Sequence, residues 1–228
     1  MNPFLRRLLV GLLIVGTAAG CNQSAADLED GATDGASAPS GEAATNMAGE
    51  AGSADAWQEF SGAGLALSLP KDYTGGNPST DLDRLAAELE AIDPQYAQRI
   101  ESIRQNPEAI AFLAFDPDSA DSGFLTNVNV ATESVPADIT IEQYLEAATQ
   151  QLAQLYEIES QEITTVGGDE AGKIVGQFNT DELQVKQLFY AIKRGDTFWI
   201  VTYATTAAEF DNRLPDFERS IQTLKLES

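Results

Sequence analysis

Two segments near the C-terminus are mainly apolar in both alternating sets of residues, the odd-numbered and the even-numbered positions. The letters TFWIVTY cover residues 197–203, and LFYAI covers residues 188–192. Successive side chains of a strand point to opposite faces of its sheet, so a strand that is apolar in both sets is covered on both faces. We therefore expect an α+β fold, in which a mainly antiparallel β-sheet is flanked by helices on both faces.

Alternation and turn residues predict the remaining strands. Leu65, Leu67 and Leu69 alternate with smaller residues before Pro70, a pattern typical of a half-buried strand. Gly-Gly and Gly-Asp pairs suit tight hairpins, because glycine accepts positive φ. Strands are expected over residues 65–70, 109–115 and 124–132, followed by a four-strand meander with turns at 167–168, 179–181 and 195–196.

Apolar residues at helical spacing predict four helices. The first begins near Ser79 or Thr80, and Thr140 with Gln143 forms a capping box that opens the longest one. The last is expected to carry Pro215 in its first turn, where the missing N–H is harmless. The predicted buried stripes are Leu82, Leu85, Leu89 and Ile92; Tyr96, Ile100 and Ile103; Tyr144, Leu145, Ala148, Leu152 and Leu155; and Leu214, Phe217, Ile221 and Leu224.

The composition changes sharply near residue 57 and divides the chain. Residues 22–56 contain no Lys, no Arg and no aromatic residue, but seven acidic residues. Such a segment cannot bury enough apolar surface to offset its ordering entropy. We expect residues 21–56 to be a disordered acidic tether rich in Ala, Gly and Ser. Residues 57–228 are expected to form one domain.

The N-terminal residues 1–20 resemble a bacterial lipoprotein signal peptide. Arg6 and Arg7 precede a short apolar run, and small residues lead to Cys21, the single cysteine of the chain. The run is shorter than the roughly 20 apolar residues that a membrane span needs. Cys21 is therefore the predicted lipid attachment site, with acyl chains such as palmitate. The alternative is ordinary secretion, which would leave Cys21 as a free thiol.

The strongly acidic composition limits the possible partners. The chain has 36 Asp and Glu against 13 Lys and Arg, a formal charge of −23, and no histidine. Such a surface repels nucleic acid phosphates and anionic lipid head groups. We expect no nucleic acid partner, and membrane attachment through the lipid anchor alone. Cations, neutral ligands and proteins with basic faces stay open as partners.

Several later motifs resemble the PsbP-like superfamily. They are the strand and helix over residues 128–155, VGGDEA at 166–171, RGDTFWIVTYA at 194–204 and LPDFERSI at 214–221. The similarity is best over residues 124–226, and the helical pair at 79–105 looks like an insertion. Members include an extrinsic subunit of photosystem II and bacterial lipoproteins of undetermined function. The resemblance implies a PsbP-like α+β fold and an extracytoplasmic accessory role, and it carries over no site residue.

Some local patterns resemble known functional motifs but also have a simpler structural explanation. The loop from Asp116 to Gly123 faintly resembles a calcium loop but lacks its later ligands, and we expect a solvated hairpin loop. Arg194–Asp196 matches an adhesion tripeptide, although a hairpin turn is the simpler interpretation. Glu157 and Glu159 offer a carboxylate pair of the kind that glycosidases use. Five larger side chains are expected in the core rather than in a ligand platform: Trp57, Phe60, Phe124, Tyr156 and Trp199.

The sequence predicts binding rather than catalysis. Without histidine or a second cysteine, Ser-His and Cys-His nucleophile pairs are excluded. We predict no catalytic residue, no metal site and no cofactor, and ligand-binding residues stay unassigned. The first hypothesis is an extracytoplasmic lipoprotein, anchored to a bacterial membrane, that acts as a binding or assembly module for a protein complex. The alternatives are a lipoprotein that binds a small ligand or a divalent cation and, third, an enzyme.

Overall fold

The structure is a computed structural model that describes residues 56–94, 96–180 and 183–227. The predicted signal peptide, Cys21 and nearly all of the predicted tether lie outside these residues, so their assignment stays a prediction. Among the described residues no helix is long and apolar enough to cross a membrane.

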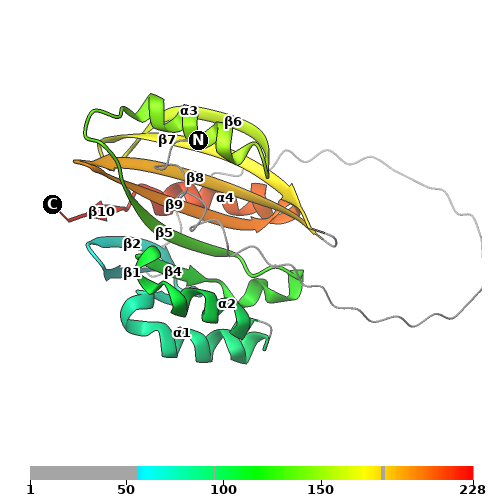
Figure 1. Ribbon diagram of the computed structural model, residues 1–228. Coiled ribbons are helices and arrows are strands. Elements are labelled where there is room, and N and C mark those ends of the chain that lie inside the picture. The colour runs from blue at the N-terminus through cyan, green and yellow to red at the C-terminus, as the bar shows by residue number, and fades with distance from the viewer. Residues whose placement is uncertain (1–55, 95, 181–182, 228) are drawn as a thin grey trace, which may run out of the picture.

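A seven-stranded antiparallel sheet forms the body of the domain (Figure 1). Its strand order is β3-β4-β5-β9-β8-β7-β6, so the predicted meander makes up its second half. A smaller sheet has the order β1-β2-β10. The strands are β1 (Trp57–Gly62), β2 (Leu65–Pro70), β3 (Thr74–Gly76), β4 (Phe112–Phe115), β5 (Asn127–Ser134), β6 (Glu157–Val166), β7 (Asp169–Asn179), β8 (Gln184–Arg194), β9 (Thr197–Thr206) and β10 (Lys225–Leu226).

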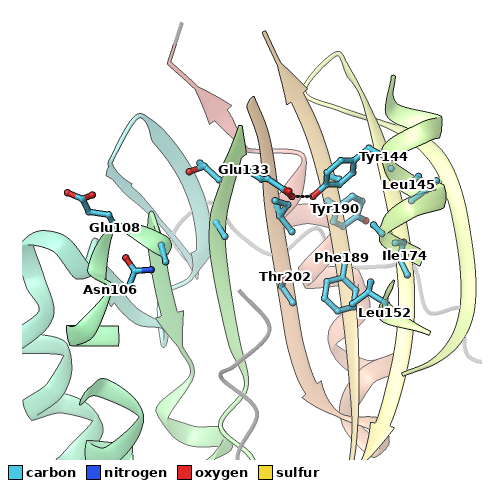
Figure 2. Close-up of a pocket in the computed structure, with 17 residues that line it drawn as sticks. Asn106, Glu108, Glu133, Tyr144, Leu145, Leu152, Ile174, Phe189, Tyr190 and Thr202 are labelled. Carbon is cyan, nitrogen blue, oxygen red and sulfur yellow. Dashed lines mark hydrogen bonds between the residues drawn. The ribbon is translucent and has the colours of Figure 1, made fainter. Parts of the chain in front are cut away.

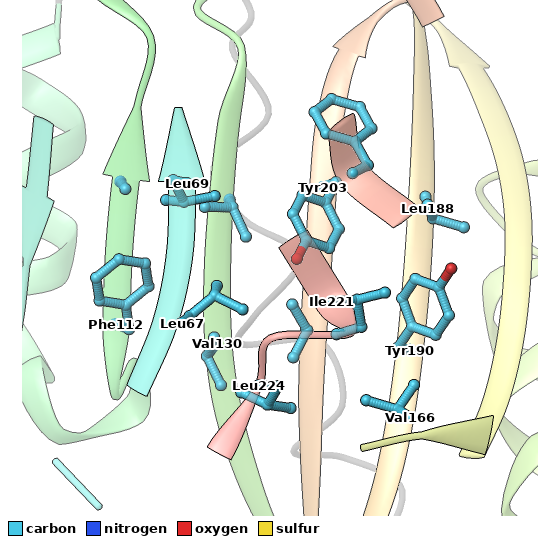
Figure 3. Packing of buried hydrophobic residues seen from close by; sticks show 14 of the residues in the cluster. Leu67, Leu69, Phe112, Val130, Val166, Leu188, Tyr190, Tyr203, Ile221 and Leu224 are labelled. Atoms are coloured by element: carbon cyan, nitrogen blue, oxygen red, sulfur yellow. The ribbon is translucent and has the colours of Figure 1, made fainter. Parts of the chain in front are cut away.

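Helices cover both faces of the large sheet. On one face α4 and strand β2 pack against a buried cluster that includes Val130, Leu188 and Tyr203 (Figure 3). On the other face α3 packs against Ile174, Phe189 and Phe198. The helices are α1 (Pro78–Ile92), α2 (Tyr96–Gln105), α3 (Ile141–Leu152) and α4 (Ala207–Ile221), with short 3₁₀ helices η3 (Pro107–Ala109) and η4 (Pro117–Ser122). The predicted α+β class, with an antiparallel sheet between helices, is confirmed.

The predicted capping box and the predicted Gly-Gly turn are both present in the structure. The Thr140 hydroxyl accepts from the Gln143 N–H, and the Gln143 side chain accepts from the Thr140 N–H, so the capping box of α3 is complete. Gly167 and Gly168 have φ values of 58° and 94° and form the turn between β6 and β7. These positive angles cost a glycine little, which is why this pair defines the hairpin.

Two predictions about the helices α4 and α3 were wrong. Pro215 lies inside α4 and not in its first turn, because the helix already begins at Ala207, where the Thr206 hydroxyl accepts from the Glu209 N–H. Leu155 was expected in the buried stripe of α3. The helix ends at Leu152, and Leu155 follows in the turn toward β6 with 58% of its surface exposed.

The loop predicted at 116–123 joins the antiparallel strands β4 and β5, as a hairpin loop does. It is more ordered than expected, because it contains the 3₁₀ helix η4 and its first residue, Asp116, is only 6% exposed. One Asp116 oxygen accepts from the Asp118 N–H at 3.1 Å, and the other accepts from Arg213 Nη1 at 2.6 Å. Both carboxylate oxygens therefore accept hydrogen bonds from protein groups.

Candidate functional site

A cavity of about 420 Å³ lies between helix α3 and the large sheet. Strands β5, β7, β8 and β9 contribute residues to it, α3 covers it, and η3 with the residue before it borders it on another side (Figure 2). It is lined by Asn106, Glu108, Ala109, Ala131, Thr132, Glu133, Tyr144, Leu145, Ala148, Leu152, Gly172, Ile174, Phe189, Tyr190, Ala191, Ile200 and Thr202.

Small residues create this space on both of its walls. Ala148 on α3 and Ala131 and Ala191 on the sheet line the cavity, where longer side chains would fill it. Gly172 lets the helix approach, because a Cβ at that position would lie 2.9 Å from Cδ1 of Leu145. The helix thus packs closely at one point and leaves room beside it.

A polar pair lies within the mostly apolar lining. Tyr144 Oη donates to Glu133 Oε2 at 2.8 Å, and the two side chains point toward one another (Figure 2). Both residues are buried, with exposures of 7%. The Tyr144 ring stacks on Phe198 with centroids 3.9 Å apart, which fixes the direction of the hydroxyl.

The tyrosine of this pair stays protonated at physiological pH. Burial raises the pKa of the Tyr144 hydroxyl far above its ordinary value, and the negative charge of Glu133 raises it further. A neutral phenol is a poor nucleophile or base. Because its one proton is donated to Glu133, the pair offers the phenol and carboxylate oxygens as acceptors to a donor group of a bound molecule.

The loop that leads into α3 is tied to the sheet by a lysine. Lys193 Nζ on β8 donates to the carbonyl oxygens of Ala137 and Ile139, just before the helix cap. Together with the capping box, this contact fixes the N-terminal end of α3 over the sheet. The position of Tyr144, one turn into the helix, follows from it.

The aromatic residues singled out from the sequence do not form the cavity. Phe124 and Tyr156 are buried at 6% exposure, and Phe60 and Trp199 pack against the core, as predicted. Trp57 is half-buried and lies under the Arg219 guanidinium, whose carbon is 4.3 Å from the ring centroid. None of these five residues lines the cavity.

The charged motifs also have ordinary partners. Glu159 binds Lys186 at 2.6 Å, and Glu157 accepts from the Gln177 amide at 3.1 Å, so different neighbours engage the two carboxylates. Arg194 binds Asp169 at 2.7 Å beside the turn at Gly195. Within the described residues no group of three or more His, Cys, Asp and Glu is placed to hold a metal ion.

Sequence reasoning missed Glu133 as a site residue and treated Tyr144 only as part of a buried stripe. One signal in the sequence could have identified it. Glu133 follows the alternating apolar run of β5, so a charged side chain is expected in a strand whose neighbours are buried. The small residues Ala131, Ala148 and Ala191 gave no such signal, because alanine is common in any core. Their common location depends on the packing of α3 on the sheet.

Comparison with solved structures finds partial likenesses. PsbP from the cyanobacterium Synechocystis sp. PCC 6803 matches with a TM-score of 0.48 and 12% identity, over 78% of this chain and 96% of its own. LpqN, involved in cell envelope biogenesis of Mycobacterium tuberculosis, matches with a TM-score of 0.49 and 13% identity, over 72% and 83%. PA94, a protein of unknown function from Pseudomonas aeruginosa, has 0.42 and 15%, over 46% and 74%.

The motifs predicted a PsbP-like fold, and a PsbP structure is among these matches. With TM-scores below 0.5 and identities of 12–15%, the likenesses carry no argument about function. A scan against protein families found no match, and a search of curated proteins found none.

Proposed function

We propose that this protein is an extracytoplasmic lipoprotein whose folded domain binds a small, mostly apolar molecule in the cavity under α3. One observation carries the proposal: a cavity of about 420 Å³ with mostly apolar walls contains a buried, hydrogen-bonded pair of a carboxylate and a phenol. Ligand pockets are typically about 300–1,000 Å³ in volume and apolar, with a few polar groups that fix orientation. This cavity is the site that we propose for the small-ligand binding that the sequence left open as an alternative.

The N-terminal residues support the proposed location of the protein. The signal-like segment ends at Cys21, and the acidic composition disfavours attachment to anionic lipid by a charged surface. Acyl chains on Cys21 would hold the protein at the membrane. The 35 residues of segment 22–56 would span about 33 Å on average if they behave as a flexible chain. The binding domain would then reach molecules at some distance above the bilayer.

Binding without chemical conversion is the role we propose for the domain. The chain has no histidine, and its single cysteine is Cys21, outside the domain. The polar pair in the cavity offers a protonated phenol beside a carboxylate to which it is already hydrogen-bonded. This arrangement recognises a polar group, but it provides no activated nucleophile.

A neutral fluorescent probe tests this proposal. We expect N-phenyl-1-naphthylamine, an uncharged apolar dye, to bind the full-length protein in a detergent-free buffer. Binding should enhance the fluorescence of the dye. Ala148→Phe places a ring in the cavity and should weaken dye binding at least tenfold. Leu155→Phe is the matched control, since it adds the same ring at a side chain that is 58% exposed outside the cavity.

The urea midpoint of each variant separates blocked binding from a damaged fold. Ala148→Phe should keep its midpoint, because the ring enters existing space and avoids most of the roughly 1–3 kcal/mol cost of overpacking. Equal dye affinity in the wild type and in a folded Ala148→Phe variant would exclude the cavity as the binding site. Equal loss in both variants would mean that the dye reports something other than the cavity.

A further inference from the structure

The strand β6 forms an open edge of the seven-stranded sheet. It is the last strand in the sheet order, and among the described residues it pairs only with β7 (Figure 1). Seven of its ten residues are exposed, while most of β7 and β8 is buried or half-buried. An edge strand presents a row of N–H and C=O groups to which another chain can add as a strand.

The direction of these backbone groups follows from the hairpin. Val166 and Asp169 flank the two-residue turn and so exchange hydrogen bonds with each other. Because the pairing alternates along an antiparallel ladder, the backbone groups of Thr165, Ile163 and Gln161 point away from β7. The Thr165 carbonyl agrees with this, since it accepts from the Gln222 side chain at 3.2 Å rather than from β7.

The two faces of the strand differ in chemistry. Ile163 lies opposite Gly172, whose missing side chain would contact Leu145, so Ile163 is on the face that α3 covers. Ile163 and Leu155, with exposures of 41% and 58%, are the large apolar side chains that the described part of the protein leaves exposed. This side of the edge therefore offers an apolar contact at Ile163, between the uncharged polar side chains of Gln161 and Thr165.

The opposite face of the strand is acidic. Glu162 and Glu218 of α4 share Lys173, at 3.2 and 2.9 Å, so this group keeps an excess negative charge. The Lys173 side chain is 18% exposed, whereas that of Glu162 is 58% exposed. Further along, Glu157 has the neutral amide of Gln177 as its partner. The carboxylates thus lie at the surface and outnumber the cations.

Charge complementarity selects one occupant for this edge. The chain's own segment 22–56 has no Lys or Arg, and a second copy would bring the same carboxylates to the interface. We propose that β6 binds an extended segment of another protein in which basic and apolar residues alternate. Added as a strand, such a segment places its basic side chains by Glu157 and Glu162 and its apolar ones by Ile163.

A synthetic peptide of alternating Lys and Val, labelled with fluorescein, is the probe for this surface. With the full-length protein in a non-ionic detergent, we expect the peptide to bind and its affinity to fall as salt rises. An alternating Glu and Val peptide should not bind. The double substitution Glu157→Gln and Glu162→Gln should weaken binding about fivefold, the size expected for two exposed charge pairs.

A proline substitution tests whether the backbone of β6 takes part. Gln161→Pro removes an outward N–H and should weaken peptide binding at least tenfold, whereas Gln161→Ala should leave it unchanged. Proline is tolerated at such edge positions. If circular dichroism shows that Gln161→Pro is unfolded, the double variant Glu157→Gln and Glu162→Gln still tests whether the peptide binds at β6.

Several results would overturn the proposal. They are equal binding of the Glu and Val peptide, equal affinity of the double variant, and peptide binding that survives Gln161→Pro in a folded protein. Concentration-dependent dimerisation that Gln161→Pro abolishes would show that a second copy occupies the edge. Crosslinks from a photoactivatable residue placed at position 163 to residues 22–55 would identify the chain's own N-terminal segment as the occupant.

Discussion

Replacing Tyr144 by Phe removes one hydroxyl from the lining of the cavity and leaves the ring in place. The ring keeps its stacking on Phe198, so little packing is lost. What disappears is the hydrogen bond of 2.8 Å to Glu133, whose carboxylate is buried. The substitution therefore measures how much this polar pair contributes to the fold of the α3 face.

The expected cost follows from the charge of the acceptor. A hydrogen bond to an ionised group contributes about 1.5–3 kcal/mol, against about 1 kcal/mol for a neutral pair. We expect Tyr144→Phe to lower the free energy of unfolding by about 2 kcal/mol. Tyr156→Phe is the matched comparison, because its hydroxyl donates over the same 2.8 Å to the neutral amide oxygen of Gln187. It should cost about 1 kcal/mol.

Urea unfolding at pH 7, followed by tryptophan fluorescence, gives both free energies. The difference between the two variants is the informative quantity, since each loses one phenolic hydroxyl from a buried site. If Tyr144→Phe costs no more than Tyr156→Phe, the Tyr144–Glu133 contact is not a charge-assisted hydrogen bond. The electrostatic description of the cavity would then be wrong.

Two further predictions concern stability. Burial raises the pKa of Tyr190 to about 12 and that of four other tyrosines further, so the unfolded chain, with tyrosine pKa near 10, binds fewer protons above that pH. The free energy of unfolding should therefore fall above pH 10, by up to about 1.4 kcal/mol per pH unit for each tyrosine, and urea midpoints unchanged from pH 8 to 11 would contradict this. Asp116→Ala leaves Arg213 without its 2.6 Å partner and should cost about 2–3 kcal/mol in urea unfolding, whereas the double variant Asp116→Leu with Arg213→Met should recover most of it. A double variant as unstable as the single one would mean that lost packing causes the effect.

The fold could be predicted where a local signal and the tertiary structure agree. The apolar runs of β8 and β9 required cover on both faces, and α3 and α4 provide it. Thr140 and Gln143 fixed the start of α3 by hydrogen bonds within four residues. Such elements depend on their own sequence and need little information from distant segments.

The errors arose where a distant partner decides the outcome. Asp116 looked like a solvated loop residue because Arg213, which neutralises it, lies 97 residues away in sequence. Pro215 suggested a helix start, but the cap at Thr206 and the buried Phe210 extend α4 toward the N-terminus despite the proline. The cavity was not predictable either, because alanines on α3, β5 and β8 enclose it only once these elements pack together.

Native mass spectrometry of the full-length protein, isolated from membranes in a mild detergent, tests the central claim most directly. We predict that wild-type protein carries a small apolar molecule as a discrete mass increment, and that Leu155→Phe retains it. Ala148→Phe should have lost it, because the new ring occupies the cavity between α3 and the sheet. If the wild type and a folded Ala148→Phe variant carry the same bound mass, the cavity does not hold the ligand.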